Sequence, residues 1–394
     1  MACTPSFIAS SLRRPRFRLK SSARGEPLRI LHTEASLGWG GQEIRILTEA
    51  AGMIGRGHRV ALACPREARI YEEAERFGVP VAALPIGAKR APGLLALRRL
   101  FPRHSFDVVN THSSTDSWLA AIACRMIKSP PALVRTRHIS ASVPRDRLTR
   151  WLYASATAQT VTTGEAIREQ LIRELGVAPE RITSIPTGVD PRRFAPSDKA
   201  AARRALKLPA AAPLVGIVAT LRSWKGHRFL VEAVPLLAHR DAQLLIVGEG
   251  PQREALQREI AELGLSERVR LAGNQNDVVP WLGALDVFAL PSYANEGVPQ
   301  ALVQAMFVGV PCVTTDAGAI GEVAVADHTA LVVARENTIA LAAAIDRVLG
   351  DKALGARLVD AARARVATRF SLDAMLDRME AVFQRAVDER SRTR

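Results

Sequence analysis

The sequence predicts an α/β protein made of two doubly wound halves, each a parallel β-sheet covered by helices. Short apolar runs alternate with amphipathic helical stretches along both halves, which is the pattern of such sheets. A chain of 394 residues with 48% hydrophobic content is also too long for one ordinary core. Doubly wound sheets bind ligands beyond the carboxyl ends of their strands, so we expect the halves to face a cleft lined by loops that follow strands.

Six short apolar runs in each half are the candidate strands, and helical patterns separate them. In the first half they are Leu28 to Thr33, Arg59 to Ala63, Val81 to Leu84, Asp107 to Asn110, Leu133 to Arg137 and Thr160 to Thr162. In the second half they are Leu214 to Val218, Gln243 to Val247, Val269 to Leu271, Val287 to Ala289, Cys312 to Thr314 and Ala330 to Val332. From about residue 335 the pattern is helical to the end.

Prolines and glycine between Thr187 and Pro213 mark the division between the halves. We predict a basic, disordered leader over residues 1–26, an N-terminal domain over 27–195, a linker over 196–212 and a C-terminal domain with terminal helices over 213–394. The leader lacks the apolar run of a secretory signal, and no stretch approaches the roughly 18 apolar residues of a membrane-spanning helix. The four cysteines form no CxxC pair, so a reducing cytoplasm is the expected compartment.

The positive charge is concentrated in the first half of the chain. Residues 1–199 contain 31 Lys and Arg against 17 Asp and Glu, a net charge of +14, and the remaining residues contribute +1 to the total of +15. Such a field attracts anionic membrane surfaces, phosphorylated acceptors or nucleic acid. An Arg-rich surface without any such partner is the plain alternative.

A glycine-rich loop follows the first candidate strand and leads directly into a helix. It reads Gly38-Trp39-Gly40-Gly41-Gln42-Glu43 and precedes the amphipathic stretch Ile44 to Ile54. Glycines before a helix N-terminus let backbone N–H groups approach a phosphate. A dinucleotide-binding fold would want GxGxxG and an acidic residue near the end of the second strand, which here ends in Ala63-Cys64-Pro65. An ordinary tight turn remains the other interpretation.

Two loops of the second half carry charged residues beside glycines. Arg222 and Lys225 follow the first strand of this half, where two cations can hold a diphosphate whose charge grows as a bond breaks. Glu296 and Gly297 precede a helical run, where a carboxylate can bind sugar hydroxyls and free N–H groups can meet a phosphate. Without the loop that carries Glu296, solvated surface charge would be the preferred interpretation of Arg222 and Lys225.

In this order, the segments resemble glycosyltransferase family 4, a retaining family with the two-domain GT-B fold. The resemblance covers nearly the whole chain, from about residue 28 to residue 385. The matching segments are Gly40 to Glu43, Thr136 to His138, Lys225-Gly226, Val247 to Pro251, Glu296-Gly297 and Gly318 to Glu322. It implies two Rossmann-like domains, an N-terminal acceptor side and a C-terminal nucleotide-sugar side, with C-terminal helices packing back on the N-terminal domain.

The resemblance also implies roles for individual residues. Glu296 stands at the first carboxylate of the family's EX7E pattern and is expected to contact the donor sugar on the face where the new bond forms. His138 is expected to contact the transferred sugar. These two are the expected catalytic residues. The donor diphosphate is expected at Arg222, Lys225, Gly297, Val298, Gly40 and Gly41, and the ribose and base at Gln304, Gly248 and Gly273.

Three positions depart from the family pattern. Gln304 stands where the pattern has a second Glu, so the ribose contact is neutral. Thr220 stands where the family often has Arg, and Arg222 takes the cationic role. Pro299 removes one backbone donor near the phosphate loop.

We therefore expect a hexosyl transferase with a nucleotide-diphosphate sugar as substrate, acting in lipopolysaccharide or envelope-glycan synthesis. No DxD or His-rich cluster marks a divalent cation, so neither metal nor other cofactor is expected. The expected partners are a lipid-linked or glycan acceptor and an anionic membrane surface, not nucleic acid, with the protein peripheral on the inner face of the cell membrane. A non-catalytic protein of membrane surfaces or nucleic acid, and a GT-B sugar epimerase, are the alternatives.

Overall fold

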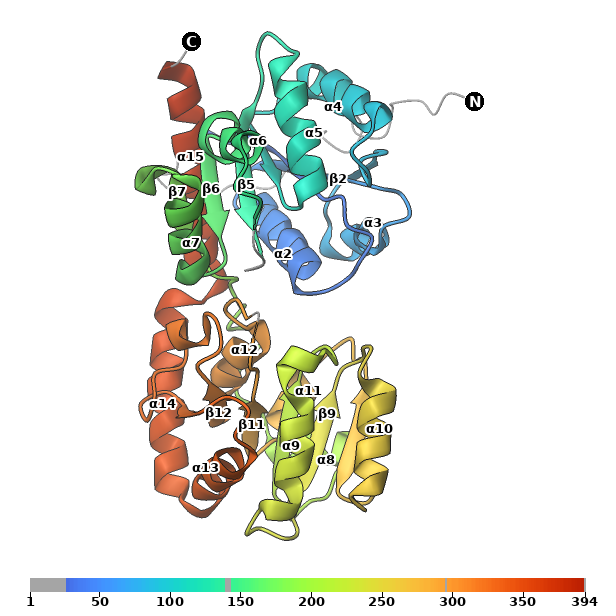
Figure 1. Ribbon diagram of the computed structural model, residues 1–394, viewed down its shortest axis with the longest axis vertical. Coiled ribbons are helices and arrows are strands. Elements are labelled where there is room, and N and C mark those ends of the chain that lie inside the picture. Colours follow the sequence, from blue (N-terminus) through green and yellow to red (C-terminus); the bar gives the residue numbers. More distant parts are fainter. Residues whose placement is uncertain (1–25, 139–142, 295, 393–394) are drawn as a thin grey trace. The chain divides into compact units, whose positions relative to one another are not determined.

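The computed structural model describes residues 26–138, 143–294 and 296–392, which form two compact α/β units (Figure 1). Unit 1 holds the described residues up to Pro186 together with those from Met375 onward. Unit 2 holds the described residues from Thr187 to Ala374. Residues 1–25 of the predicted leader lie outside the described residues.

The described part of unit 1 contains a seven-stranded parallel sheet with the order β3-β2-β1-β4-β5-β6-β7. Its strands are β1 (Arg29–Thr33), β2 (Arg59–Cys64), β3 (Val81–Ala83), β4 (Val108–Thr111), β5 (Ala132–Arg137), β6 (Gln159–Thr162) and β7 (Ile182–Ser184). The six strands predicted for this half are confirmed within one residue at each end. Strand β7 was not predicted, because only one of its three residues is apolar.

Helices cover both faces of this sheet (Figure 1). They are α2 (Gly41–Gly55), α3 (Arg69–Glu73), α4 (Ala91–His104), α5 (Ser114–Arg125), α6 (Arg147–Trp151), α7 (Glu165–Leu175) and most of α15 (Leu372–Arg392), with short turns η1 (Ala74–Phe77), η2 (Leu152–Ala156) and η3 (Pro179–Arg181). Helix α15 buries Met375, Met379 and Phe383 in unit 1. The predicted return of the C-terminal segment to the N-terminal domain is therefore confirmed for α15.

The described part of unit 2 contains a six-stranded parallel sheet with the order β10-β9-β8-β11-β12-β13. Its strands are β8 (Leu214–Val218), β9 (Gln243–Val247), β10 (Val269–Gly273), β11 (Val287–Leu290), β12 (Cys312–Thr315) and β13 (Leu331–Val333). The helices are α8 (Lys199–Ala205), α9 (His227–Ala233), α10 (Arg253–Glu262), α11 (Val279–Gly283), α12 (Gln300–Val308), α13 (Thr338–Gly350) and α14 (Lys352–Arg369), with turns η4 (Ser223–Lys225), η5 (Val234–Leu236) and η6 (Ile320–Glu322). All six strands predicted for this half are confirmed.

The units differ from the predicted domains in two places. Residues 187–195 and the predicted linker belong to unit 2, and α15 from Met375 onward belongs to unit 1. Backbone hydrogen bonds explain the first difference, because Val189 donates to Phe370 and accepts from Leu372. Helix α8 is held likewise, since its Arg203 donates to the carbonyl of Ala284 over 3.0 Å.

The strand order of each sheet fixes where a ligand can bind. The order reverses between β1 and β4 in unit 1 and between β8 and β11 in unit 2. Loops that leave two such neighbouring strands turn to opposite faces of the sheet and open a crevice between them. The loops after β1 and β4, and after β8 and β11, are therefore the places to search for functional side chains.

Candidate active site

In unit 2, the loop after β8 carries Lys225 to the reversal of strand order. Turn η4 ends at Lys225, and α9 begins immediately after Gly226. Gly226 has a φ of +75°, and a Cβ atom there would lie 2.0 Å from the carbonyl oxygen of Pro291. Only glycine fits this position. The close approach packs the Lys225 loop against the loop that follows β11.

Lys225 forms an ion pair with Glu296, which lies on the loop after β11. Its Nζ atom lies 2.7 Å from Oε1 and 2.9 Å from Oε2 of Glu296. The hydroxyl of Ser292 donates to Oε1 over 2.6 Å. The side chain of Glu296 is 4% exposed and that of Lys225 is 20% exposed. The carboxylate is thus withdrawn from water, whereas part of the cation stays open to a ligand.

A second tight backbone contact holds Glu296 in place. Its carbonyl oxygen accepts the N–H of Ala319 over 3.0 Å. Gly318 has a φ of +56°, and a Cβ atom there would lie 2.1 Å from the same oxygen. The segment Gly318 to Glu322, which the sequence resemblance included, therefore supports the loop that carries Glu296 by backbone packing.

Gly297 and Val298 lead from this carboxylate to helix α12, as the sequence predicts. The helix begins at Gln300 with Pro299 as its N-cap, and proline has no N–H to donate. The first N–H groups of a helix lack intrahelical acceptors, so this end suits a phosphate. Gln304 lies further along the same helix and is half-buried.

The remaining predicted donor residues of unit 2 make contacts of their own beside the ion pair, and the carbonyl of Arg222 accepts the N–H of Lys225 over 3.1 Å. Arg222 is exposed, and its guanidinium lies over the ring of Trp224 at 5.6 Å. Gly248 and Gly273 follow or end β9 and β10, and the N–H of Gly248 donates to the carbonyl of Gly273 over 2.9 Å. A Cβ atom on Gly248 would lie 2.0 Å from the carbonyl oxygen of Ala219, just past β8. These glycines thus let three strand ends approach closely.

In unit 1, the glycine-rich loop is organised around Glu34, which the sequence analysis did not single out. Its Oε1 atom accepts the N–H of Ser36 over 2.7 Å, and Oε2 accepts from the amide of Gln42 over 2.5 Å. Gly40 is the N-cap of α2 and Gly41 its first residue. Burial raises the pKa of Glu34 to about 8, so this carboxyl is largely protonated at pH 7.

Three histidines at the carboxyl ends of β1, β4 and β5 form a hydrogen-bonded chain. Nδ1 of His32 lies 2.9 Å from Nε2 of His112, and Nδ1 of His112 lies 2.9 Å from Nε2 of His138. Burial lowers the pKa of His32 to about 3 and holds the pKa values of His112 and His138 well below their ordinary value. All three rings are therefore neutral at pH 7. Only His138 was predicted as a site residue.

The cap of helix α5 fixes His112. The buried carboxylate of Asp116 accepts the N–H of His112 over 2.9 Å and the hydroxyl of Thr33 over 2.6 Å. Asp116 also completes a capping box with Ser113. These bonds join the loop after β4 to the end of β1. The position of His112 directly after a strand is the sequence signal that could have found it.

Arg45 and Glu49 lie fully buried on α2 near the histidines. Nε of Arg45 lies 3.6 Å from a carboxylate oxygen of Glu49, and Nη1 donates to the carbonyl of Ile185 over 2.7 Å.

Within the described ranges, no group of three His, Cys, Asp or Glu side chains is arranged to hold a metal ion. None of the helices described there is long and apolar enough to span a membrane.

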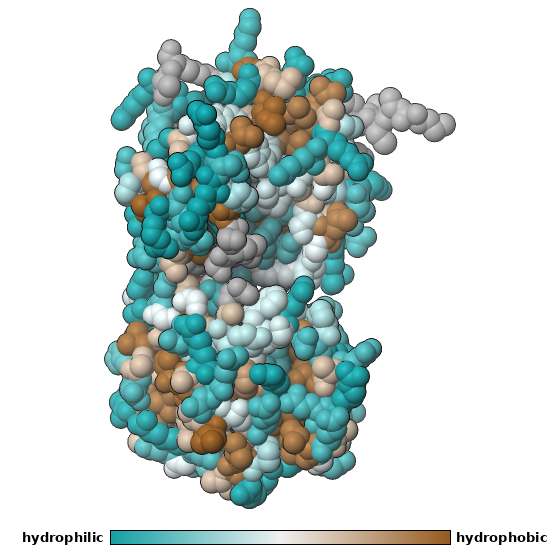
Figure 2. Space-filling model, viewed as in Figure 1, coloured by the Kyte–Doolittle hydropathy of each residue, from teal (hydrophilic) through white to brown (hydrophobic). Residues whose placement is uncertain are grey.

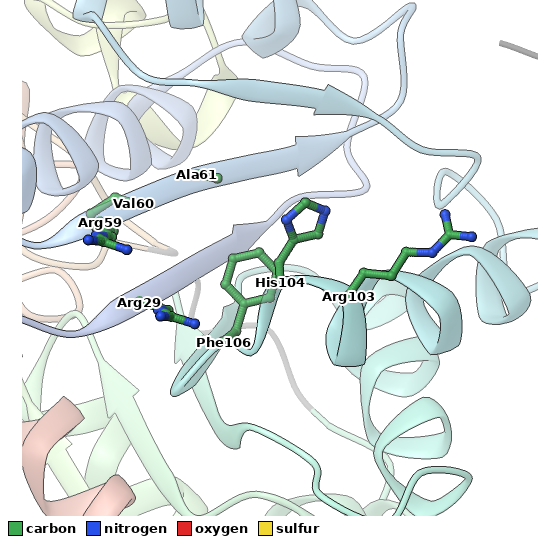
Figure 3. Close-up of a pocket in the computed structure, with 7 residues that line it drawn as sticks. All are labelled: Arg29, Arg59, Val60, Ala61, Arg103, His104 and Phe106. Atoms are coloured by element: carbon green, nitrogen blue, oxygen red, sulfur yellow. The ribbon is translucent and has the colours of Figure 1, made fainter. Parts of the chain in front are cut away.

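A pocket of about 200 Å³ lies at the opposite end of the unit 1 sheet (Figure 3). It is lined by Arg29, Arg59, Val60, Ala61, Arg103, His104 and Phe106. Arg29 and Arg59 are the first residues of β1 and β2, so the pocket lies at the amino ends of the strands. The carboxylate of Asp107 accepts the N–H of Arg29 over 2.8 Å, and the C-terminus of α4 ends at His104. The pocket is separate from the candidate site. Its arginines lie beside the carboxylate of Asp107 and the partly negative C-terminal end of α4.

Comparisons with known proteins agree along the chain. The model of Glycosyltransferase Family 4 matches residues 39–193, and the model of Glycosyl transferases group 1 matches residues 212–351. The chain is 30% identical to UDP-Gal:alpha-D-GlcNAc-diphosphoundecaprenol alpha-1,3-galactosyltransferase of Escherichia coli, over 58% of this chain and 62% of that protein. It is 28% identical to 2-deoxystreptamine glucosyltransferase of Streptomyces kanamyceticus, over 79% of this chain and 90% of that protein.

Solved structures share the fold. A glycosyltransferase from Rickettsia africae has a TM-score of 0.83 at 21% identity, covering 92% of this chain and 99% of that one. HepE of Anabaena, in complex with UDP and glucose, has a TM-score of 0.80 at 21% identity, covering 91% and 99%. Two doubly wound units, with polar side chains on the loops where the strand order reverses, and the match to the group 1 model thus define a glycosyltransferase of the GT-B fold. The two family models narrow this class, and the chain belongs to glycosyltransferase family 4.

Proposed function

We propose that the protein transfers a sugar from a nucleotide-diphosphate sugar to an acceptor hydroxyl with retention of anomeric configuration. The observation that carries this proposal is the Lys225–Glu296 pair beside the N-terminus of α12. A partly open cation next to a helix N-terminus suits a departing diphosphate, and a fixed carboxylate suits sugar hydroxyls. HepE, which shares the fold, binds UDP and glucose, which supports a donor of this class.

The proposed chemistry needs no protein nucleophile. The bond between the anomeric carbon and the diphosphate oxygen breaks, and the acceptor oxygen bonds to the same carbon on the same face. The acceptor proton passes to the departing diphosphate oxygen. Cationic side chains and backbone N–H groups stabilise the growing negative charge, and none of these steps needs a metal ion.

The roles of the site residues follow from the chemistry of their atoms. Glu296 accepts hydrogen bonds from the donor sugar, and His138 contacts the transferred sugar. The diphosphate meets Lys225, Arg222, Gly297 and Val298, with Gly40 and Gly41 offering further backbone donors. The ribose and base meet Gln304, Gly248 and Gly273, where Gln304 binds ribose hydroxyls without charge.

Activity is tested by the release of nucleoside diphosphate. The purified protein is incubated with each common nucleotide sugar, with and without a membrane extract that supplies acceptors. We expect release that depends on one donor and on the extract, and a product whose anomeric proton coupling in NMR matches that of the donor. Release without an acceptor would favour a sugar epimerase. An inverted product would refute retention, and no release with any donor would refute the transfer.

We also propose a lipid-linked acceptor on an anionic membrane surface, in lipopolysaccharide or related envelope-glycan synthesis. The Escherichia coli relative is named for an acceptor linked to a lipid diphosphate, diphosphoundecaprenol. LpsB of Rhizobium meliloti is named a lipopolysaccharide core biosynthesis mannosyltransferase and is 30% identical over 51% of this chain. The net charge of +14 in residues 1–199 supports attraction to such a surface.

A surface feature of unit 1 supports this docking. Ile122, Met126 and Leu148, on or next to α5 and α6, are 40%, 42% and 67% exposed. The half-buried rings of Trp118 and Trp151 stack between the same helices with centroids 6.0 Å apart. We call these five residues the α5–α6 patch. Figure 2 shows hydrophobic residues at the surface of this part of unit 1, among hydrophilic ones.

Two cations lie against the tryptophans of the α5–α6 patch. Lys89 lies 5.6 Å from the ring of Trp118, and Arg125 lies 5.8 Å from the ring of Trp151. Apolar side chains and tryptophans within a basic rim are typical of surfaces that lie on anionic lipid. The occupant we propose is therefore the membrane surface itself.

Flotation with liposomes tests the docking. Vesicles with anionic lipid, at low and high salt, are mixed with the full chain or with a chain that lacks residues 1–26. We expect salt-sensitive flotation that persists without the leader and weakens in Leu148→Ser. Ile339→Ser is the matched control, because Ile339 is 76% exposed on unit 2. No flotation under any condition, or equal loss in both variants, would refute docking by this patch.

A further inference from the structure

The histidine chain of unit 1 can be hydrogen-bonded in only two senses. Each neutral imidazole carries one N–H and one lone pair, so a donor at one nitrogen makes the other an acceptor. His32, His112 and His138 are joined by two bonds of 2.9 Å, each between Nδ1 of one ring and Nε2 of the next. The three tautomers therefore change together. Either all three rings carry the proton on Nδ1, or all three carry it on Nε2.

The two senses leave different atoms at the buried end. Nε2 of His32 is buried and has no hydrogen-bond partner among the described residues. When all three rings are protonated on Nδ1, this atom carries only a lone pair. When all three are protonated on Nε2, it carries a hydrogen and becomes an N–H group. Buried N–H groups without an acceptor are rarer in proteins than under-used acceptors, because the donor loses its whole hydrogen bond to water.

The surroundings of His32 keep its ring neutral, because burial and a nearby cation both lower its pKa. The positive Arg45 guanidinium acts on the His32 ring. Arg45 contacts Sδ of Met379, and His32 meets the ring of Phe383, one turn further along α15, edge to face at 6.4 Å. A cation nearby disfavours a second proton on the ring, so His32 carries a single N–H and the tautomer is decided by the unpartnered Nε2.

We propose that His32 and His112 are positioning residues that hold His138 in the Nδ1–H tautomer, so that His138 presents an N–H donor to an oxygen of the transferred sugar. In this sense each ring donates from Nδ1 to Nε2 of the next, and the last donor, Nδ1 of His138, has no partner among the described residues. His138 is only partly buried, so a ligand can reach its ring. The identity of that ligand rests on the proposed function, but the tautomer does not.

The tautomers can be read directly from the protein in solution. The full chain is labelled with ¹⁵N-histidine, and long-range ¹H–¹⁵N spectra at pH 7 separate protonated from unprotonated ring nitrogens. We expect Nδ1 to be the protonated nitrogen in His32, His112 and His138. Protonation on Nε2, a charged ring, or a mixture at His138 would overturn the proposal, whatever the enzyme's activity.

A remote substitution separates positioning from simple packing. His32→Leu removes the donor to His112 but touches no atom of His138. We expect the His138 signal to change from one tautomer to a mixture, and turnover of the donor to fall by at least about tenfold, as expected for one lost hydrogen bond at the transition state. Binding of free nucleoside diphosphate, which we propose at Lys225 and at backbone donors outside the histidine chain, should stay unchanged.

His104→Gln is the matched control, because His104 lies at the end of α4 and outside the chain of three histidines. It should leave the His138 tautomer and turnover unchanged. If His32→Leu leaves the His138 tautomer single, the chain does not position His138. If the tautomer becomes mixed but turnover does not fall, the positioning role fails while the proposed transfer stands. If His32→Leu does not fold, the spectrum of the unaltered chain still decides the tautomer.

Discussion

Lys225→Met is expected to affect both stability and turnover, and the structure allows the two effects to be separated. The substitution keeps an apolar stem but leaves Glu296, 4% exposed, with Ser292 as its remaining side-chain donor. Removing one partner of a buried ion pair costs roughly 3–5 kcal/mol. Because Lys225 is 20% exposed, water screens part of the interaction, and we expect a loss of about 2–3 kcal/mol in unit 2.

The control is the double variant Lys225→Met/Glu296→Gln. A glutamine removes the unpaired charge and still accepts from Ser292, so the double variant should recover to within about 1 kcal/mol of the original chain. Hydrogen exchange of peptides from β8 and α12 measures the stability of unit 2 separately from unit 1. Unchanged exchange in Lys225→Met would show that the ion pair is not formed in solution.

Turnover should not recover with stability. Loss of a charge-assisted contact to the growing diphosphate charge costs on the order of 3 kcal/mol, which is about a hundredfold in rate. The release of nucleoside diphosphate should therefore stay low in Lys225→Met and in the double variant. Undiminished turnover in Lys225→Met would remove Lys225 from the mechanism.

Four further predictions concern the site and its surroundings. Glu296→Ala should lower transfer far more than the affinity for free nucleoside diphosphate, and an equal loss of both would assign Glu296 to the nucleotide or to the fold. Activity should survive EDTA, whereas complete loss restored by Mg²⁺ or Mn²⁺ would contradict the proposed site. Gly318→Ala should destabilise unit 2 by at least about 1–3 kcal/mol by hydrogen exchange, because its Cβ would lie 2.1 Å from the carbonyl oxygen of Glu296 at a positive φ, and normal stability would refute that packing. Unit 1 should be most stable near pH 6.5. The pKa values of His32, His112 and His138 are lowered in the folded chain, so stability falls as the pH drops below about 6.5, where the unfolded histidines bind protons. The pKa values of Glu34, about 8, and Glu49, about 7, are raised in the folded chain, so stability also falls as the pH rises through those values. Hydrogen exchange that slows steadily from pH 5 to pH 9, after correction for the intrinsic rate, would contradict this.

The sheets could be predicted from the sequence because their strands are buried on both faces. Leu214–Val218 and Gln243–Val247 are continuous apolar or nearly apolar runs, and the predicted bounds agree with those of β8 and β9. Strand β7 (Ile182–Ser184) could not be predicted, because an edge strand of three residues contains too few apolar positions to show a pattern. The unit boundary was placed about ten residues late, since proline density marks loops and does not show which sheet a loop packs against.

The candidate site was predictable where a charged or glycine-rich loop follows a strand. Lys225 and Glu296 were found in this way, and the structure joins them at 2.7 Å. Contacts between distant segments were not predictable. His32 and His112 are 80 residues apart, and nothing in their local sequence shows that their rings meet. The same is true of Glu34, whose raised pKa depends on burial.

The two units offer opposite kinds of chemistry at their strand ends. In unit 1, burial keeps the three histidines neutral and Glu34 largely protonated at pH 7, so the groups there are uncharged donors and acceptors. Such groups suit sugar hydroxyls, which are neutral and lose little when they leave water for equally neutral partners. In unit 2, the partly exposed ammonium group of Lys225, paired with the carboxylate of Glu296, suits an anion. In the proposed reaction, the neutral histidines therefore leave the departing diphosphate to Lys225 and to backbone donors, so substitutions in the histidine chain should change transfer without changing the affinity for nucleoside diphosphate.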